Sequence, residues 1–265
     1  MPYQILSDVH THTLFSRHAY STLAEDVAAA QKLGLELLGI SDHFSIMSYR
    51  DQFLYNFQYL YNMGCWPRDW DGVTVLRGCE ADILDYDGTL FGEKEIVTEN
   101  IVGRPFPEPR PLLELATQHV DYVIASVHDP VLAAEATLAQ ATEMYVKALD
   151  KKAVLILGHT GRAGAKYDLD TVLLHAKEKH KLIEINEHSF DLGIYDEVCT
   201  SVAERCAELG VGITVSSDAH IAHDIGRYPR TIEMLEEIHF PEELIMNRDR
   251  DTFLAALEAG GCYLH

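Results

Sequence analysis

Seven short apolar runs alternate with amphipathic segments along the 265 residues of the chain. The runs read QILSDV, LELLGIS, VTVLRGCE, VDYVIASV, AVLILGH, KLIEIN and VGITVSSD. Nearly continuous apolar runs of this length are typical of parallel strands, which are covered on both faces. The alternation with helical segments therefore predicts an α/β fold, either a parallel barrel or a doubly wound sheet.

The segments between the runs predict amphipathic helices. In TLAEDVAAAQKLG, Thr22 is a candidate N-cap, Glu25 follows three residues later and Gly34 stands at the end. This arrangement is typical of a capping box and of a helix stop. The segments TLAQATEMYVKALDKK, TVLLHAKEKH and VCTSVAERCAELG follow the same pattern.

Two stretches depart from this pattern. Residues 44–66 are rich in aromatic side chains, and we predict a helical insertion that covers the barrel or forms an oligomer interface. Aromatic residues at helical spacing more often belong to a core. DYDGTL, at 85–90, contains an Asp-Gly pair and predicts a small hairpin. Since no linker or repeat interrupts the chain, residues 1–265 are predicted to form a single domain.

The composition narrows the function classes. The chain has 42 acidic and 21 basic residues, which gives a formal net charge of −21. A field of this sign disfavours long nucleic acids and anionic membranes. A small anionic substrate is still allowed, because bound cations can reverse the local sign.

Cysteine usage and the N-terminal residues indicate the compartment. The five cysteines are odd in number and lack CxxC spacing, so we expect reduced thiols. The N-terminus has neither the basic nor the long apolar region of a signal peptide, and no apolar run reaches the ~20 residues needed to span a membrane. These features predict a cytoplasmic protein.

Most of the apolar runs end in side chains that bind metal ions. Six of the seven do so, with His10 and His12, His43, Glu80, His128, His159, and Asp218 with His220. The carboxyl ends of parallel barrel strands form one face, where active sites lie. A coincidence of unrelated surface histidines at six strand ends is therefore a poor explanation.

The spacing of these residues predicts more than one ion. Because side chains alternate along a strand, His10 and His12 point the same way, and His18 follows in the next loop. Imidazole and carboxylate ligands suit zinc, manganese or iron. Nine candidate ligands exceed the ~4–6 that one ion takes, so two or three ions are expected, with Glu80 as the bridging carboxylate.

The motifs resemble those of a known family. DVHTHT, SDH, VHDP and SSDAH are similar to the four motifs of the PHP (polymerase and histidinol phosphatase) family. HAYSTL, WDGVTVLRGCEADI and the ending SDAH…FPEELIMN most closely resemble its YcdX-type phosphatase branch, over nearly the whole chain. The resemblance implies a distorted (β/α)7 TIM-like barrel with a trinuclear metal site at the carboxyl ends of the strands.

The resemblance also implies three divalent metal ions and their ligand sets. One ion would take His10, His12, Glu80 and Asp218, a second would share Glu80 and take His128 and His159, and a third would take His18, His43 and His220. It further suggests a homo-oligomer, such as a trimer. Thr160, Asp129, Glu187 and His188 depart from the residues expected at their positions, as does the length of the insertion, and these departures bear on the substrate.

The function implied is that of a metal-dependent phosphoesterase, above all a phosphomonoesterase on a small phosphorylated metabolite such as L-histidinol phosphate. A hydroxide between two metals would attack phosphorus in line. Asp8 could orient a ligand histidine, Arg17 and Arg162 could clamp phosphate, and His188 could contact the substrate or protonate the leaving group. Arg227 is a weaker candidate for the phosphate. Ordinary ion pairs and loop contacts are the alternatives for these residues.

Three other functions compete with this one. A phosphodiesterase or exonuclease would act on mono- or short oligonucleotides. A metal-dependent amidohydrolase commonly needs a lysine at a strand end, and no lysine stands there. A non-catalytic metal-binding regulatory module would keep the ligands without hydrolysis. The sequence leaves open the physiological substrate, the metals bound in the cell and the general acid.

Overall fold

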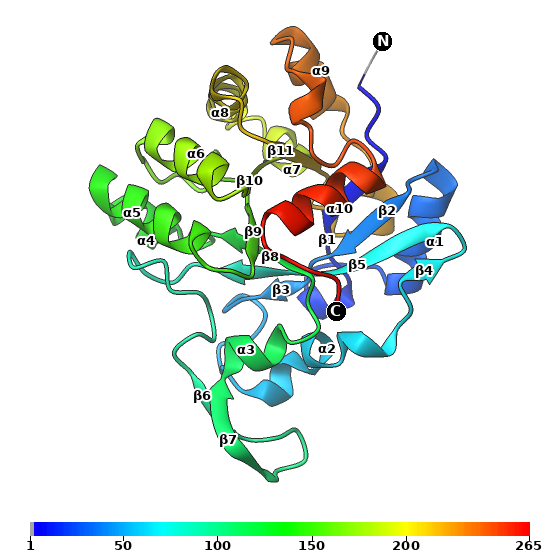
Figure 1. Cartoon of the computed structure of the whole chain (residues 1–265), viewed down its shortest axis with the longest axis vertical. Coiled ribbons are helices and arrows are strands. Elements are labelled where there is room, and N and C mark those ends of the chain that lie inside the picture. The colour runs from blue at the N-terminus through cyan, green and yellow to red at the C-terminus, as the bar shows by residue number, and fades with distance from the viewer. Residues whose placement is uncertain (1–2) are drawn as a thin grey trace.

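A parallel β-sheet that closes almost completely into a barrel forms the centre of the molecule (Figure 1). The computed structural model describes residues 3–265. The barrel strands, in order, are β1 (Ser7–Thr11), β2 (Leu37–Ile40), β5 (Val73–Asp82), β8 (Tyr122–Ser126), β9 (Val154–Leu157), β10 (Leu182–Asn186) and β11 (Ile213–Ser216). Each coincides with one of the seven apolar runs, and β1 and β5 continue two residues beyond theirs. The barrel prediction is thus confirmed, in preference to a doubly wound sheet.

Helices surround the barrel. They are α1 (Leu23–Leu33), α2 (Gln58–Tyr61), α3 (Leu112–Ala116), α4 (Pro130–Glu135), α5 (Leu138–Leu149), α6 (Leu169–Glu178), α7 (Glu187–Asp191), α8 (Asp196–Leu209), α9 (Pro229–Glu237) and α10 (Arg250–Ala259). The predicted capping box of α1 is present, with Thr22 and Glu25 bonding to each other's backbone N–H. Gly34 ends the helix at a φ of 73°, a conformation that glycine adopts without strain.

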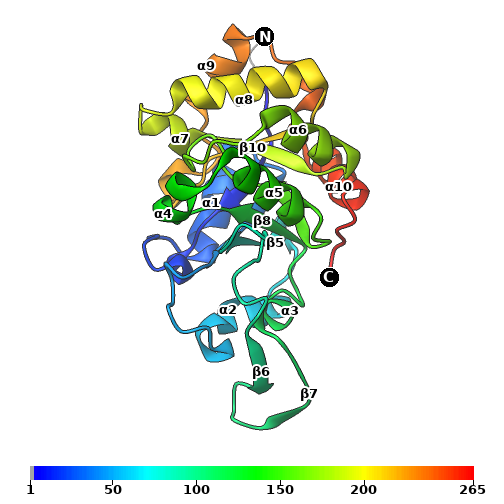
Figure 2. The same cartoon turned by 90° about the vertical axis from the view of Figure 1, so that its left-hand side faces the viewer.

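Apolar side chains fill the interior of the barrel at the end where the strands begin, and polar side chains lie at the other end. Val9, Leu37, Leu76 and Ile124 form an interior cluster with Phe253 of α10. In Figure 2, α10 lies on the side of the sheet opposite to α4 and α7. Because α10 closes the end where the strands begin, the carboxyl ends of the strands remain for a functional site.

The barrel closes between β1 and β11 without a regular ladder. The two strands are joined by an isolated bridge between Thr11 and Ala219 and by two backbone hydrogen bonds. The N–H of Asp218 donates to the carbonyl of His10 at 3.0 Å, and the N–H of His12 donates to that of Ala219 at 2.9 Å. This irregular closure of the barrel therefore also fixes the backbones of His10, His12 and Asp218 relative to one another.

A β-bulge in β1 breaks the alternation of side chains. Asp8 pairs with Leu38 and Thr11 with Ile40, so β1 has one more residue than β2 between these positions. Tyr122 fills the barrel beside the bulge, and its hydroxyl donates to the carbonyl of Val9 at 2.6 Å. A side chain at Gly39 would meet this hydroxyl, which explains the glycine there.

The insertion at 44–66 supports the short strand that carries His43. The short strand β3 (His43–Phe44) pairs with β5, as does β4 (Asp69–Trp70) on the other side of the insertion. Phe44 packs edge-on against Phe57 and Phe91, with ring centroids 4.8 and 5.0 Å away. The Tyr59 hydroxyl donates to the carbonyl of His43 at 2.5 Å. Much of this aromatic stretch is therefore core.

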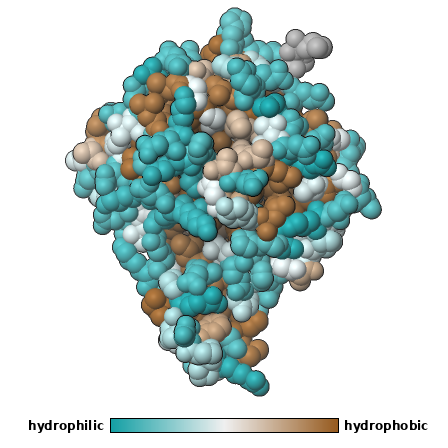
Figure 3. All heavy atoms as spheres, viewed as in Figure 1, coloured by the Kyte–Doolittle hydropathy of each residue, from teal (hydrophilic) through white to brown (hydrophobic). Residues whose placement is uncertain are grey.

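A second excursion was not predicted. The strands β6 (Ile96–Glu99) and β7 (Pro105–Pro111) form an antiparallel hairpin that projects from the barrel, at the bottom of Figures 1 and 2. Its exposed residues include Ile96 and Val102, and apolar residues are visible among polar ones on this lobe in Figure 3. The predicted hairpin at 85–90 is present as a tight turn closed by the Ile83–Leu90 bridge.

Among residues 3–265, no helix combines the length and apolar character that crossing a bilayer requires.

Asp26 is a buried carboxyl group on α1. Burial raises its pKa from 3.8 to about 8, and the negative charges of Asp42 and Asp8 add to this, while the Ser21 hydroxyl opposes it. The folded protein therefore favours the protonated form. The stability that this preference contributes is present below about pH 4 and is lost as the pH rises through about 8.

We predict that Asp26→Asn stabilises the protein at pH 8 and has little effect at pH 4.5. Asparagine resembles the protonated acid, so the variant avoids the cost of a buried charge, on the order of 1–3 kcal/mol at pH 8. Urea unfolding of both proteins at the two pH values measures the difference. A variant that is less stable than the parent at pH 8 would show that the carboxylate is needed there.

Candidate metal centre

The nine candidate ligands lie together at the carboxyl end of the barrel. Glu80, buried on β5, stands at their centre. Its carboxylate oxygens lie 2.8–3.6 Å from a ring nitrogen of each of five histidines, namely His10, His12, His43, His128 and His159. The strand ends that carry these side chains are far apart in sequence and adjacent in the barrel.

Two of the expected ligand sets share Glu80. Oδ1 of Asp218 lies 3.6 Å from Nε2 of His10 and 3.2 Å from Nε2 of His12, so these residues and Glu80 face a common point. On the other side, Nε2 of His128 and of His159 lie 3.3 and 2.9 Å from Oε1 of Glu80. A carboxylate between two such groups has the position of a bridging ligand.

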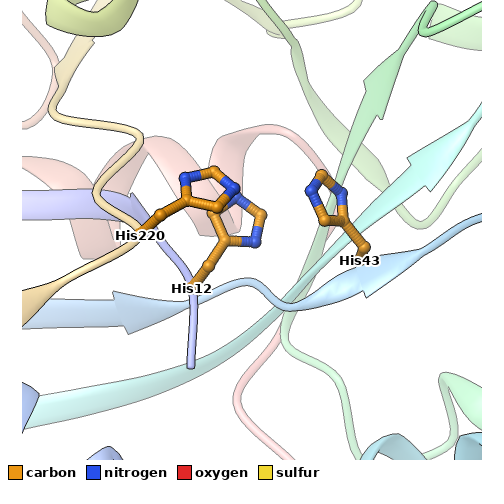
Figure 4. Close-up of side chains that lie close together, drawn as sticks. All are labelled: His12, His43 and His220. Atoms are coloured by element: carbon orange, nitrogen blue, oxygen red, sulfur yellow. The ribbon is translucent and has the colours of Figure 1, made fainter. Parts of the chain in front are cut away.

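The third set lies further toward the mouth. Candidate ligand atoms of His12, His43 and His220 lie within 4.8 Å of one another. In Figure 4 the rings of His220 and His12 overlap, with centroids 4.3 Å apart, and His43 faces them from β3. Nε2 of His18 lies 2.9 Å from Nε2 of His220. The structure thus brings His12 close to the three histidines expected for this set.

The cluster fits divalent cations. Six buried atoms within it have no hydrogen-bond partner among the described residues: Nε2 of His10 and of His12, both ring nitrogens of His43, Nδ1 of His159 and Oε2 of Glu80. A buried polar atom left unpaired costs about 1–3 kcal/mol. Imidazole and carboxylate lone pairs that converge in this way are the donor set of zinc, manganese or iron.

The electrostatics of the cluster also favour cations. Burial opposes ionisation of Glu80, yet the imidazoles of His128, His10 and His43 hold its pKa well below the usual range. Burial would lower the pKa of His128, but Glu80 and Asp82 raise it to about 10. The carboxylates thus hold protons on nearby histidines, and bound metal ions would take the place of those protons.

Hydrogen bonds at Nδ1 direct several imidazoles toward the cluster. Nδ1 of His10 bonds to Glu184 at 2.6 Å, and Nδ1 of His128 to Asp82 at 2.7 Å. Nδ1 of His12 bonds to the hydroxyl of Ser16 at 2.9 Å, and this hydroxyl donates in turn to Asp42. Nδ1 of His220 bonds to the carbonyl of Asp218. With the proton on Nδ1, each ring presents Nε2 to an ion.

Glu184, on β10, was not singled out in the sequence. It is buried, and in addition to its bond with His10 it accepts the backbone N–H of His159 at 2.9 Å and a hydrogen bond from Ser216. One carboxylate therefore holds members of both Glu80-sharing sets. The only signal in the sequence was the position of this acidic residue between two isoleucines in the apolar run KLIEIN.

Two candidate ligands have strained backbones. His159 has a φ of 28° and Asp218 a φ of 55°, in a region that residues other than glycine rarely adopt. The bond from His159 N–H to Glu184 and the closure bond from Asp218 N–H to His10 hold these conformations. Such strain is often found at functional sites, where the surrounding structure maintains it.

A cavity of about 590 Å³ opens onto the cluster. His188, Arg162 and Arg227, the candidate substrate contacts of the sequence analysis, are among the residues that line it. The guanidinium of Arg162 donates to Oδ2 of Asp218 at 2.9 Å. Met47, Glu187, Asp191, Leu192 and Asp224 also line the cavity and were not predicted as site residues. Glu187 is engaged in capping α9, since it accepts the N–H groups of Arg230 and Thr231.

The structure corrects the roles expected of Asp8 and Arg17. Asp8 accepts hydrogen bonds from Ser217, at 2.5 Å from its hydroxyl, and from the N–H of Gly226, rather than from a histidine ring. Asp8 thus ties β1 to Ser217, which directly follows β11, and to the loop that contains Gly226. Arg17 donates to the carbonyl of Ser48 and lies over the Tyr49 ring, outside the lining of the cavity.

Comparisons with known proteins agree with this geometry. The PHP domain family model matches residues 8–188. A probable phosphatase of Clostridium acetobutylicum is 37% identical over 259 residues, which cover 97% of this chain and 96% of that protein. A probable phosphatase of Caldicellulosiruptor saccharolyticus is 36% identical over 255 residues, with 96% of each chain covered.

One solved structure supports the fold. The histidinol phosphate phosphatase of Lactococcus lactis, complexed with zinc, L-histidinol and phosphate, aligns with a TM-score of 0.55 at 19% identity. The alignment covers 89% of this chain and 92% of that one.

We predict that Glu184→Gln weakens metal binding by ~10–100-fold, because removal of a carboxylate behind a ligand histidine frees the orientation of the ring. Competition with a zinc chelator measures the affinity. Glu233→Gln, on the exposed side of α9, is the matched control. An affinity equal to that of the parent, in a variant with an unchanged circular dichroism spectrum, would contradict this role.

Proposed function

The chain belongs to the PHP domain family, and from this premise we propose that it is a metal-dependent phosphomonoesterase that acts on a small phosphorylated metabolite. The observation that carries the proposal is the cluster of nine histidine and carboxylate side chains, with Glu80 at its centre, beside a cavity that Arg162 lines. The relatives named probable phosphatases cover nearly the whole chain, so the resemblance includes the cavity as well as the ligands.

We propose that three divalent cations bind here, zinc, manganese or iron. His10, His12, Glu80 and Asp218 would hold the first, Glu80, His128 and His159 the second, and His18, His43 and His220 the third. Such ions lower the pKa of water and neutralise phosphoryl oxygens. In the overall reaction water adds to phosphorus, the ester P–O bond breaks, and the alcohol leaves with a proton.

The side chains around the ions would bind and orient the phosphate ester. Arg162 lies at the boundary between the cluster and the cavity, and its remaining N–H groups could donate to non-bridging phosphoryl oxygens. His188 lines the same cavity, with its ring 6.3 Å from that of His220, and could give a proton to the leaving oxygen. Arg227 could add a second positive charge at the rim.

L-Histidinol phosphate is the substrate that we propose to test first. Support comes from the fold shared with a phosphatase crystallised with L-histidinol and phosphate. The cavity also has Asp191 and Asp224 in its lining, and carboxylates of this kind could attract the ammonium group of an amino alcohol phosphate.

The proposal predicts the metal content of the protein. Protein purified without chelators and then supplied with metal should hold about two to three divalent ions per chain, as nine ligands allow. His128→Ala should hold fewer, because it removes one of the ligands shared around Glu80. Mass spectrometry of the eluted metals gives the count, with His175→Ala on α6 as the control. At most one tightly bound ion in the parent protein would count heavily against the site.

The proposal also predicts the activity of the protein. Metal-loaded protein should hydrolyse L-histidinol phosphate with a kcat/KM several decades above that for p-nitrophenyl phosphate, and His128→Ala should lose both activities. Similar slow rates on the two esters, both lost in the variant, would retain the phosphatase and reject histidinol phosphate. Hydrolysis of neither ester by metal-replete protein would overturn the proposal and direct attention to phosphodiesters or to a regulatory module.

A further inference from the structure

A second cavity adjoins the metal centre on the far side of Arg162. It has a volume of about 350 Å³, and it shares His128 and Arg162 with the main cavity. His159 lines this second cavity and not the main one. The two cavities therefore reach the same cluster from two directions, with a guanidinium and an imidazole between them.

The two cavities differ in chemistry. Apart from His128, His159 and Arg162, the second cavity is lined mainly by small or apolar side chains, namely Val127, Pro130, Ala133, Ala134, Ala163 and Tyr195. The main cavity has charged groups in its lining, among them Asp191, Asp224 and Arg227. In the second cavity, an apolar organic group would be shielded from water mainly by apolar side chains. In the main cavity, the same group would also displace water from charged side chains, which is unfavourable.

Local structure keeps the second cavity open. Its walls are the short helix α4, which begins at Pro130 beyond the Asp129 N-cap, and the loop after β9. Ala133 and Ala134 place only methyl groups on the cavity side of this helix. In the loop, Gly164 has a φ of 81°, and a Cβ there would have no atom within 4 Å. The sequence therefore supplies little bulk at the positions that could fill the space.

We propose that the second cavity is a subsite for the organic group of the phosphate ester and that it favours an apolar or aromatic group. A phosphate held by Arg162, which lines both cavities, could direct an apolar or aromatic part of its organic group into this subsite, while charged parts of the ester, such as an ammonium group, stay in the main cavity beside Asp191 and Asp224. The inference rests on the proposed function, since it assumes that a phosphate ester binds at Arg162. The subsite is of the size expected for small-molecule pockets, which begin at ~300 Å³.

Binding of non-hydrolysable phosphonates tests the subsite directly. Manganese-loaded protein should bind phenylphosphonate roughly tenfold more tightly than methylphosphonate in calorimetric titrations, as a filled apolar pocket implies. Ala134→Phe should bring the ratio of the two affinities close to one, because the added ring occupies the subsite. Ala134 is exposed, so the fold should tolerate the change. Ala163→Leu, from the opposite wall, provides a second variant.

Leu174→Phe, on the exposed face of α6, is the matched control and should keep the preference for phenylphosphonate. Equal affinities in the parent protein, no binding of either phosphonate, or a preference that persists in both cavity variants would each overturn the subsite. Hydrolysis of p-nitrophenyl phosphate, measured in parallel, separates the two proposals. A phenylphosphonate preference without hydrolysis removes the phosphatase and keeps the subsite, whereas hydrolysis without the preference does the reverse.

Discussion

A buried carboxylate stays ionised only where positive charge or hydrogen-bond donors surround it, and the carboxyl end of this barrel is arranged around Glu80 in that way. Ser126 donates to one oxygen at 2.6 Å, and five imidazoles approach the two oxygens. The register of the sheet places these groups, since His43 lies directly opposite Glu80 on the neighbouring strand. The geometry of the centre is therefore a property of strand pairing more than of the loops.

Protons alone cannot satisfy this cluster. His18 and His220 face each other through Nε2 atoms 2.9 Å apart, so the two rings cannot both be protonated without strong repulsion. Burial and the charges of His43 and His220 lower the pKa of His18 to about 4. Cations shared by several lone pairs resolve this conflict, because each ring then remains neutral at the nitrogen facing its neighbour.

The parts of this molecule that sequence reveals are those that depend on local pattern. The seven apolar runs mark the strands, and side chains at their ends are visible because a strand end is a local feature. Glu184 could not be identified in the same way, because its role depends on contacts with His10 and His159 across the barrel. The β1 bulge is equally hidden, because it is a property of the pairing between β1 and β2. The proline-rich β7 lacks the signals of a strand, since proline is disfavoured in strands.

The net charge of −21 and an anionic substrate are compatible only if attraction is local. At long range the surface repels phosphates, and within the cavity Arg162, Arg227 and bound cations would reverse the sign over distances shorter than a Debye length, ~8 Å at physiological salt. A small ester can place its whole charge inside that region. A nucleic acid chain would leave most of its phosphates outside, against the acidic surface. The same balance of charges that builds the centre therefore favours substrates small enough to enter the cavity.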